Sequence, residues 1–204
     1  MKTQEFLSER QNDMTRFEMT YTKSDIKSFF DETSKKKVLK NLIMTYSVVG
    51  IVIFSVFLIV SFSLSNRKAL PFIFIGVFIL FTAWAILRTL KNAPDKMYKN
   101  LTANYDGGIM VSCFEKDRFY TGIIPAEADE EASENTNIIS EENMMLYSAI
   151  EKVVESDNYF YIFANAKSAQ IIRKSALTEG SIEEVRENLK KSLNEKYEDI
   201  TKLR

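Results

Sequence analysis

The chain has 204 residues, an almost even balance of 27 Lys and Arg against 28 Asp and Glu, and no histidine. This length suits one domain with an accessory segment, and the lack of histidine removes the commonest general base and the commonest transition-metal ligand. The single cysteine, Cys113, leaves no partner for an intrachain disulfide and is expected to be a small apolar residue of a strand in a reducing compartment.

The amino-terminal segment, residues 1–40, predicts one strand followed by one helix. Phe17, Met19 and Tyr21 alternate with polar residues, which is typical of a half-buried strand. The sequence SDIKSFFDETSKKK then predicts a helix that is capped by Ser24 and continues into the next segment. Because one strand is not stable alone, Phe17–Thr22 is expected to pair with strands far along the chain.

Two long uncharged runs follow, Leu42–Leu64 and Ala69–Leu87. Each is long enough to cross about 30 Å of hydrocarbon, which takes about 20 apolar residues. We predict transmembrane helices within residues 41–66 and, together with a short outer loop, within residues 67–87. Two buried helices of a soluble core are the disfavoured alternative, because long helices that are apolar on every side are rare in small domains. Neither run holds an ionisable residue, which favours an anchor over a pump or transporter acting alone.

Cations near the ends of these runs predict their orientation. The connection holds only Arg67 and Lys68, whereas more cations precede the first run and follow the second, so the positive-inside rule places both termini in the cytoplasm. These flanking cations are usually a topology signal. The sharper hypothesis is contact with anionic lipid, at roughly 1 kcal/mol per cation. The candidate lipid contacts are Lys35, Lys36, Lys37, Lys40, Arg88 and Lys91.

Residues 88–204 predict a cytosolic domain of short strands closed by one helix. Strands are expected in two hairpins, at Ile109–Glu115 with Arg118–Ile124 and at Tyr159–Ala164 with Ser168–Arg173. Met144–Glu155 fits either a strand or a helix. The sequence SIEEVRENLKKSLNEKY predicts the final helix, with a capping box of Ser181 and Glu184 and an apolar stripe formed by Ile182, Val185, Leu189 and Leu193. This pattern predicts an antiparallel sheet or partly open barrel covered by the helix.

The segment Pro125–Asn143 is rich in Asp and Glu and poor in apolar residues, so we predict a solvated loop, with an acidic partner-binding tail as the alternative. In the strand at Tyr159–Ala164, Phe160 and Ile162 form one face. The residues Tyr159, Tyr161 and Phe163 form the other. Because both faces are apolar, this second face is a candidate partner face, although the final helix covering it is the simpler explanation.

The order of these parts resembles the YcxB-like family of bacterial membrane proteins. The resemblance lies in CFEKDRF, YSAIEKV, YFYIF, IIRK and the final helix, after an amino-terminal strand and a two-helix hairpin. It implies a domain of pleckstrin-homology-like type, a bacterial cell membrane location and a Met144–Glu155 segment that is mainly strand. It implies no established activity, and the acidic segment is longer than a plain hairpin needs.

No motif in the sequence predicts catalysis, a cofactor or a metal site. Adjacent carboxylates such as Glu130–Glu131 lie in polar surroundings, and no nucleophile has a neighbouring base, so we expect no enzyme activity. Residues 88–204 hold more carboxylates than cations, which disfavours nucleic acid. The predicted function is a membrane-tethered binding or scaffold module, whose partners are the lipid bilayer and possible protein partners, including a second copy. The alternative is an accessory subunit of a membrane transporter or export system.

Overall fold

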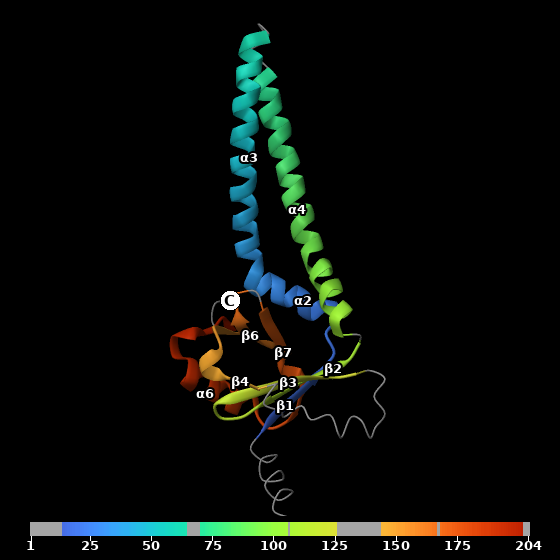
Figure 1. Ribbon diagram of the computed structural model, residues 1–204, viewed down its shortest axis with the longest axis vertical. Coiled ribbons are helices and arrows are strands. Elements are labelled where there is room, and N and C mark those ends of the chain that lie inside the picture. Colours follow the sequence, from blue (N-terminus) through green and yellow to red (C-terminus); the bar gives the residue numbers. More distant parts are fainter. Residues whose placement is uncertain (1–13, 65–69, 106, 126–143, 167, 202–204) are drawn as a thin grey trace, which may run out of the picture. The chain divides into compact units, whose positions relative to one another are not determined.

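The computed structural model describes residues 14–64, 70–105, 107–125, 144–166 and 168–201, which divide into two compact units (Figure 1). The first unit combines Met1–Asp25 with Tyr98–Arg204, and the second is Ile26–Met97. The first unit is therefore assembled from two parts of the chain that the second unit separates.

One sheet of the first unit has the strand order β4-β3-β2-β1-β8. Its strands are β1 (Thr15–Met19), β2 (Ile109–Phe114), β3 (Arg118–Ile124), β4 (Met144–Leu146) and β8 (Leu177–Glu179). Within β1, Phe17 lies opposite Ser112 of β2 and opposite Leu177 of β8. The predicted long-range pairing of the amino-terminal strand is thus confirmed, and this strand lies inside the sheet rather than at its edge.

The other sheet has the order β7-β6-β5-β9. Its strands are β5 (Lys152–Glu155), β6 (Tyr159–Asn165), β7 (Ser168–Arg173) and β9 (Tyr197–Asp199). Only the β5–β9 pair is parallel. The β6–β7 hairpin is the predicted pair of this sheet, and β9 was not predicted. The sheets do not close into a barrel. The Met144–Glu155 segment is mainly strand, with β4 and β5 separated by a 3-10 turn at Tyr147–Ala149, as the family resemblance implied.

The main core of the first unit is shared by both sheets and by α6 (Ile182–Leu193). Phe17, Phe114 and Phe119 come from the first sheet, and Phe160 and Ile162 from the second. The predicted stripe of α6 contacts this core, with Val185, Leu189 and Leu193 buried and Ile182 partly buried. The helix therefore packs on the Phe160 and Ile162 face of β6, not on the Tyr161 face.

Both predicted helix caps differ from the structure. Thr22, not Ser24, precedes α2 (Lys23–Phe29): its hydroxyl accepts from the Asp25 amide at 3.3 Å and its amide donates to Asp25 Oδ2 at 2.7 Å, which is a capping box. At α6 the predicted box of Ser181 and Glu184 does not form. The Ser181 hydroxyl donates to Glu183 instead, and its amide donates to Thr15.

The second unit is a pair of long helices. A π-helical turn at Phe30–Ser34 leads into α3 (Lys35–Leu64), and α4 (Leu70–Tyr105) runs antiparallel to it, past Pro94 (Figure 1). Gly50 of α3 lies directly against Phe78, and the rings of Phe57 and Phe74 stack with centroids 4.7 Å apart. Lys23–Ile59 and Ile73–Ala103 are long and apolar enough to cross a membrane by length and composition, and none of their most apolar part is buried inside the structure.

Three short turns complete the described chain: the 3-10 turn at Tyr147–Ala149 and two others at Lys174–Ala176 and Asn194–Lys196. The acidic segment at 126–143 and the connection at 65–69 lie outside the described residues, so the expectations for them stay predictions.

Candidate functional site

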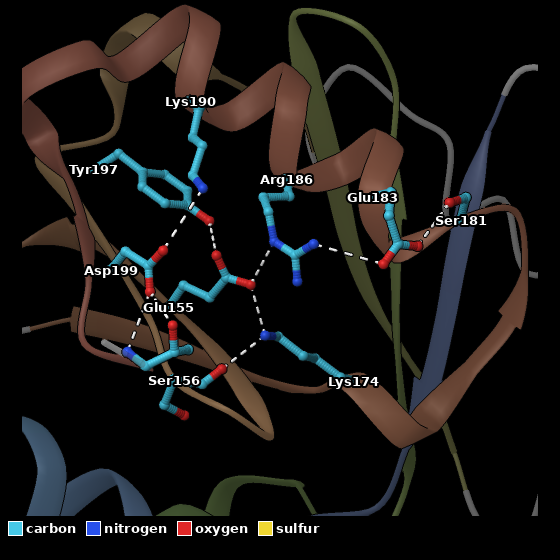
Figure 2. A network of polar contacts seen from close by, with 10 residues as sticks. Glu155, Ser156, Lys174, Ser181, Glu183, Arg186, Lys190, Tyr197 and Asp199 are labelled. Carbon is cyan, nitrogen blue, oxygen red and sulfur yellow. Dashed lines mark hydrogen bonds and ion pairs between the residues drawn. The ribbon is translucent and has the colours of Figure 1, made fainter. Parts of the chain in front are cut away.

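The most concentrated polar chemistry of the first unit surrounds Glu155, at the end of β5. Its carboxylate is 1% exposed, and it accepts hydrogen bonds from three side chains (Figure 2). Lys174 Nζ donates to Oε1 at 2.6 Å and Arg186 Nε donates to the same oxygen at 2.8 Å. The Tyr197 hydroxyl donates to Oε2. A fully buried carboxylate is thus neutralised by two cations and a phenol.

The three donors come from separate elements, so Glu155 joins them. Lys174 lies in the turn after β7, Arg186 on α6 and Tyr197 at the start of β9. Lys174 also donates to the carbonyl of Ser156 at 2.7 Å and lies 4.8 Å from the centre of the Phe160 ring. The carboxylate therefore fixes the end of sheet β7-β6-β5-β9 to the helix that covers the core.

These contacts set the titration of the group. Burial raises the pKa of Glu155, but the hydrogen bonds from Lys174, Tyr197 and Arg186 outweigh burial and hold the pKa below its usual value. Burial and the hydrogen bond to Glu155 raise the pKa of the Tyr197 phenol. At neutral pH the carboxylate is ionised and the phenol is protonated, and the phenol proton is held in the hydrogen bond to Glu155.

A second buried carboxylate, Asp25, lies where the first segment of the first unit ends. It is 1% exposed. Arg173 donates to both of its oxygens, at 2.9 and 2.5 Å, and the Tyr159 hydroxyl donates to Oδ1 at 2.9 Å. Burial raises the pKa of Asp25, but the Arg173 and Thr22 hydrogen bonds hold it below its usual value. Asp25 ties the capped start of α2 to β6 and β7.

The two carboxylates are related through the chain, because Arg173 and Lys174 are consecutive residues at the end of β7. One cation reaches Asp25 and the next reaches Glu155. Each carboxylate is buried and accepts at least three hydrogen bonds from side chains of other elements or from its own cap, which suits it to holding elements together. No group of three or more His, Cys, Asp or Glu that could hold a metal ion occurs within the described ranges.

Sequence reasoning missed both carboxylates. It considered adjacent acidic pairs such as Glu130–Glu131, which lie outside the described residues, whereas Glu155 and Asp25 are single acids beside apolar neighbours. The available signals were Thr22 three residues before Asp25, a capping-box spacing, and Glu155 at the end of the apolar pair Val153 and Val154.

The candidate partner face of β6 is largely covered in the structure. Tyr159 is 8% exposed and Tyr161 is 0% exposed, and their rings stack with centroids 5.6 Å apart. Only Phe163 is half-buried. Inside the domain the Tyr159 hydroxyl donates to Asp25, and the Tyr161 ring is fully buried. A partner contact at Phe163 stays a prediction.

The candidate lipid contacts all lie on the second unit and are exposed: Lys35, Lys36, Lys37, Lys40, Arg88 and Lys91. Lys35 forms an ion pair with Asp31 at 2.9 Å, and the Arg88 guanidinium lies 5.1 Å from the centre of the Trp84 ring. Cys113, in contrast, is 2% exposed within β2, and burial raises the pKa of its thiol to about 11, in keeping with the structural role expected for it.

Comparison with known proteins yields one match. No curated protein and no solved structure matches the chain. Residues 133–189 match the model of the family described as YcxB-like protein. This stretch begins within the acidic segment and continues through β4, β5, β6, β7 and β8 into α6, and it includes Glu155 and all of its donors except Tyr197. The match confirms the resemblance found in the sequence for residues 133–189, which are similar to the YcxB-like family.

Proposed function

We propose that this protein is a membrane-tethered binding or scaffold module without enzyme activity. In this proposal the second unit is a two-helix hairpin through the bacterial inner membrane, with both termini in the cytoplasm, and the first unit is a cytosolic domain of pleckstrin-homology-like type. The single observation that carries the proposal is the position of β1 between β2 and β8. The apolar helices are thereby an insertion within a folded domain, and the domain cannot be separated from them by one cut.

The pleckstrin-homology-like assignment is supported by the arrangement of the first unit. Two sheets share one core, and a helix near the carboxyl terminus packs on that core. Among the described strands, β7 pairs only with β6 and β4 pairs only with β3, so each has one edge free of a strand partner. Strand edges are places where an extended peptide can add to a sheet, which supports a protein segment or a second copy as the partner.

The orientation is tested by labelling introduced cysteines in a Cys113→Ala background. Ser65→Cys, in the connection, should react with a membrane-impermeant maleimide in intact spheroplasts. Ser168→Cys, which is exposed in the first unit, should react only after lysis. Labelling of Ser65→Cys only after lysis would overturn the orientation.

The tether is tested by replacing Leu42–Leu87 with an unrelated two-helix anchor of the same length. If the hairpin is only a tether, photo-crosslinking from Phe163 and from the β7 edge captures the same partner with either anchor. The second candidate, an accessory subunit of a transporter or export system, is supported by the exposed apolar side chains along both helices, such as Ile51 and Leu80. It predicts that the replacement abolishes capture.

A further inference from the structure

The two helices of the second unit bring two groups of cations to one level. Phe57 of α3 stacks on Phe74 of α4, which fixes the register of the antiparallel pair. At 1.5 Å per residue, Lys40 lies about 25 Å along α3 from that contact, and Lys91 lies about 25 Å along α4 in the same direction. Arg88 lies about 21 Å along α4 on the same count. Cations distant in sequence thus form a belt around one end of the helix pair.

The carboxylates nearest the belt along the helices are Asp31, Glu32 and Asp95, which flank it. Residues 35–94 contain no Asp or Glu. Within the part of the chain that the structure describes, Lys35, which precedes the belt, forms an ion pair with Asp31. Lys36, Lys37, Lys40 and Lys91 are exposed and have no such partner there. Exposed cations in this number attract an anion from outside the chain.

The surface next to the belt is apolar. Ile43, Met44 and Leu87 are 50%, 62% and 67% exposed. Leu87 directly precedes Arg88, and Ile43 and Met44 lie within about one helical turn after Lys40. Trp84 is 54% exposed and lies under the Arg88 guanidinium, 5.1 Å from ring centre to Cζ. A tryptophan beside a cation at the end of an apolar surface is the arrangement found at a membrane interface. The ligand must therefore be anionic at one end and apolar at the other.

We propose that Lys36, Lys37, Lys40, Arg88 and Lys91 form a binding belt for the phosphate headgroups of anionic phospholipids, whose acyl chains cover Ile43 and Leu87. This inference rests on the proposed membrane-spanning function and names the lipid class that the hairpin selects. A phospholipid supplies the anionic headgroup and the apolar chains in one molecule, whereas a nucleic acid supplies only the phosphate. Each belt cation raises the affinity for an anionic surface roughly five-fold.

Trp84 is the only tryptophan of the chain, so its fluorescence reports this position alone. The full chain is reconstituted in phosphatidylcholine bilayers, and quenching of Trp84 by dibrominated phosphatidylglycerol is compared with quenching by dibrominated phosphatidylcholine. The expected result is a relative binding constant at least about five-fold in favour of phosphatidylglycerol, reduced by raised salt. In the variant Lys40→Gln/Arg88→Gln/Lys91→Gln the preference should fall at least about five-fold, the factor that one cation carries.

The matched control removes three exposed cations outside the belt: Lys99→Gln/Lys116→Gln/Lys191→Gln. It should keep the preference of the natural chain, and inorganic phosphate should not compete. Equal quenching by both lipids, or a preference that survives in the belt variant, would overturn the proposal. If neither brominated lipid quenches Trp84, the hairpin is outside the bilayer and the proposed function itself is wrong, which separates the two failures.

Discussion

Replacing Glu155 is the sharpest test of how the first unit is held together. The carboxylate is 1% exposed and accepts from Lys174, Arg186 and Tyr197. Glu155→Gln keeps the shape and one acceptor oxygen, which can serve Lys174 and Arg186, while its new amide can donate to the Tyr197 oxygen. Glu155→Ala removes every acceptor and leaves Lys174, 9% exposed, with the Ser156 carbonyl.

The two variants should therefore differ in magnitude. Glu155→Gln loses the charge but keeps the geometry. Because a hydrogen bond to a charged group contributes more to stability than one to a neutral group, this substitution should lower the free energy of unfolding by about 2 kcal/mol. Glu155→Ala leaves a buried cation without its partner, which costs about 3–5 kcal/mol. The control, Glu187→Gln on the exposed side of α6, should stay within about 0.5 kcal/mol of the natural chain.

The chain supplies its own probe for this measurement. Cys113 is the only cysteine and is 2% exposed in β2, between β1 and β3. Burial raises its thiol pKa to about 11, so the folded protein holds it protonated and unreactive. The fraction of Cys113 labelled in a short pulse of thiol reagent, measured by mass across a urea series in lipid nanodiscs, gives the unfolding free energy. Trp84 cannot serve, because it lies in the second unit.

The effect should also depend on pH. The folded-state pKa of Glu155 is lowered, so its contribution is fully present above the unfolded value, near 4.5, and is lost as the pH falls through the folded value. The stability gap between the natural chain and Glu155→Gln should therefore be constant near neutral pH and shrink below about 4.5. A Glu155→Gln variant as stable as Glu187→Gln, or a gap that widens in acid, would refute this account of the network.

Three further substitutions test other parts of the structure. Asp25→Asn keeps the capping box but loses the charge facing Arg173, so it should lower the free energy of unfolding by about 1–2 kcal/mol in the Cys113 assay. Asp25→Ala should lower it further, and equal losses for the two variants would argue against the Arg173 ion pair. Gly180→Ala should cost roughly 2 kcal/mol or more in the same assay, because Gly180 has φ +85° and its Cβ would lie 2.7 Å from the Thr15 Cα; a neutral result would contradict the β1–β8 pairing. Gly50→Leu should push the helices of the second unit apart, because even a Cβ at this position would lie 2.5 Å from Phe78. The distance between spin labels at Ile43 and Leu87 should therefore lengthen. The control Gly76→Ala, where the space is open, should leave that distance unchanged.

Local patterns predicted most elements well. The hairpins at Ile109–Ile124 and Tyr159–Arg173 follow from alternating or continuous apolar runs around polar turns, and the stripe of α6 follows from helical spacing. Both signals reside in neighbouring residues, so they survive without knowledge of the fold. The short strands β8 and β9 were not predicted, because three-residue strands have no periodicity and exist only through the partner that they meet.

The capping residues show where local reasoning stops. Ser24 and Thr22 are both acceptable caps by sequence, and Thr22 is used because Asp25 is then placed to receive Arg173 from a strand almost 150 residues away. At α6, Ser181 is the predicted cap, but its amide is taken by Thr15 of β1. In both cases a distant partner decides between local choices of similar energy.

The sequence by itself determined the two long apolar helices, the strands of both hairpins and the amphipathic final helix, because each depends on the hydrophobicity of residues a few positions apart. Only the tertiary structure decided that β1 lies between β2 and β8, that Tyr161 is fully buried, and that Glu155 and Asp25 are the charged centres of the first unit. A carboxylate is tolerated in a buried position only when cations from other elements surround it. Those cations are distant in the sequence, so local sequence patterns do not predict the contact.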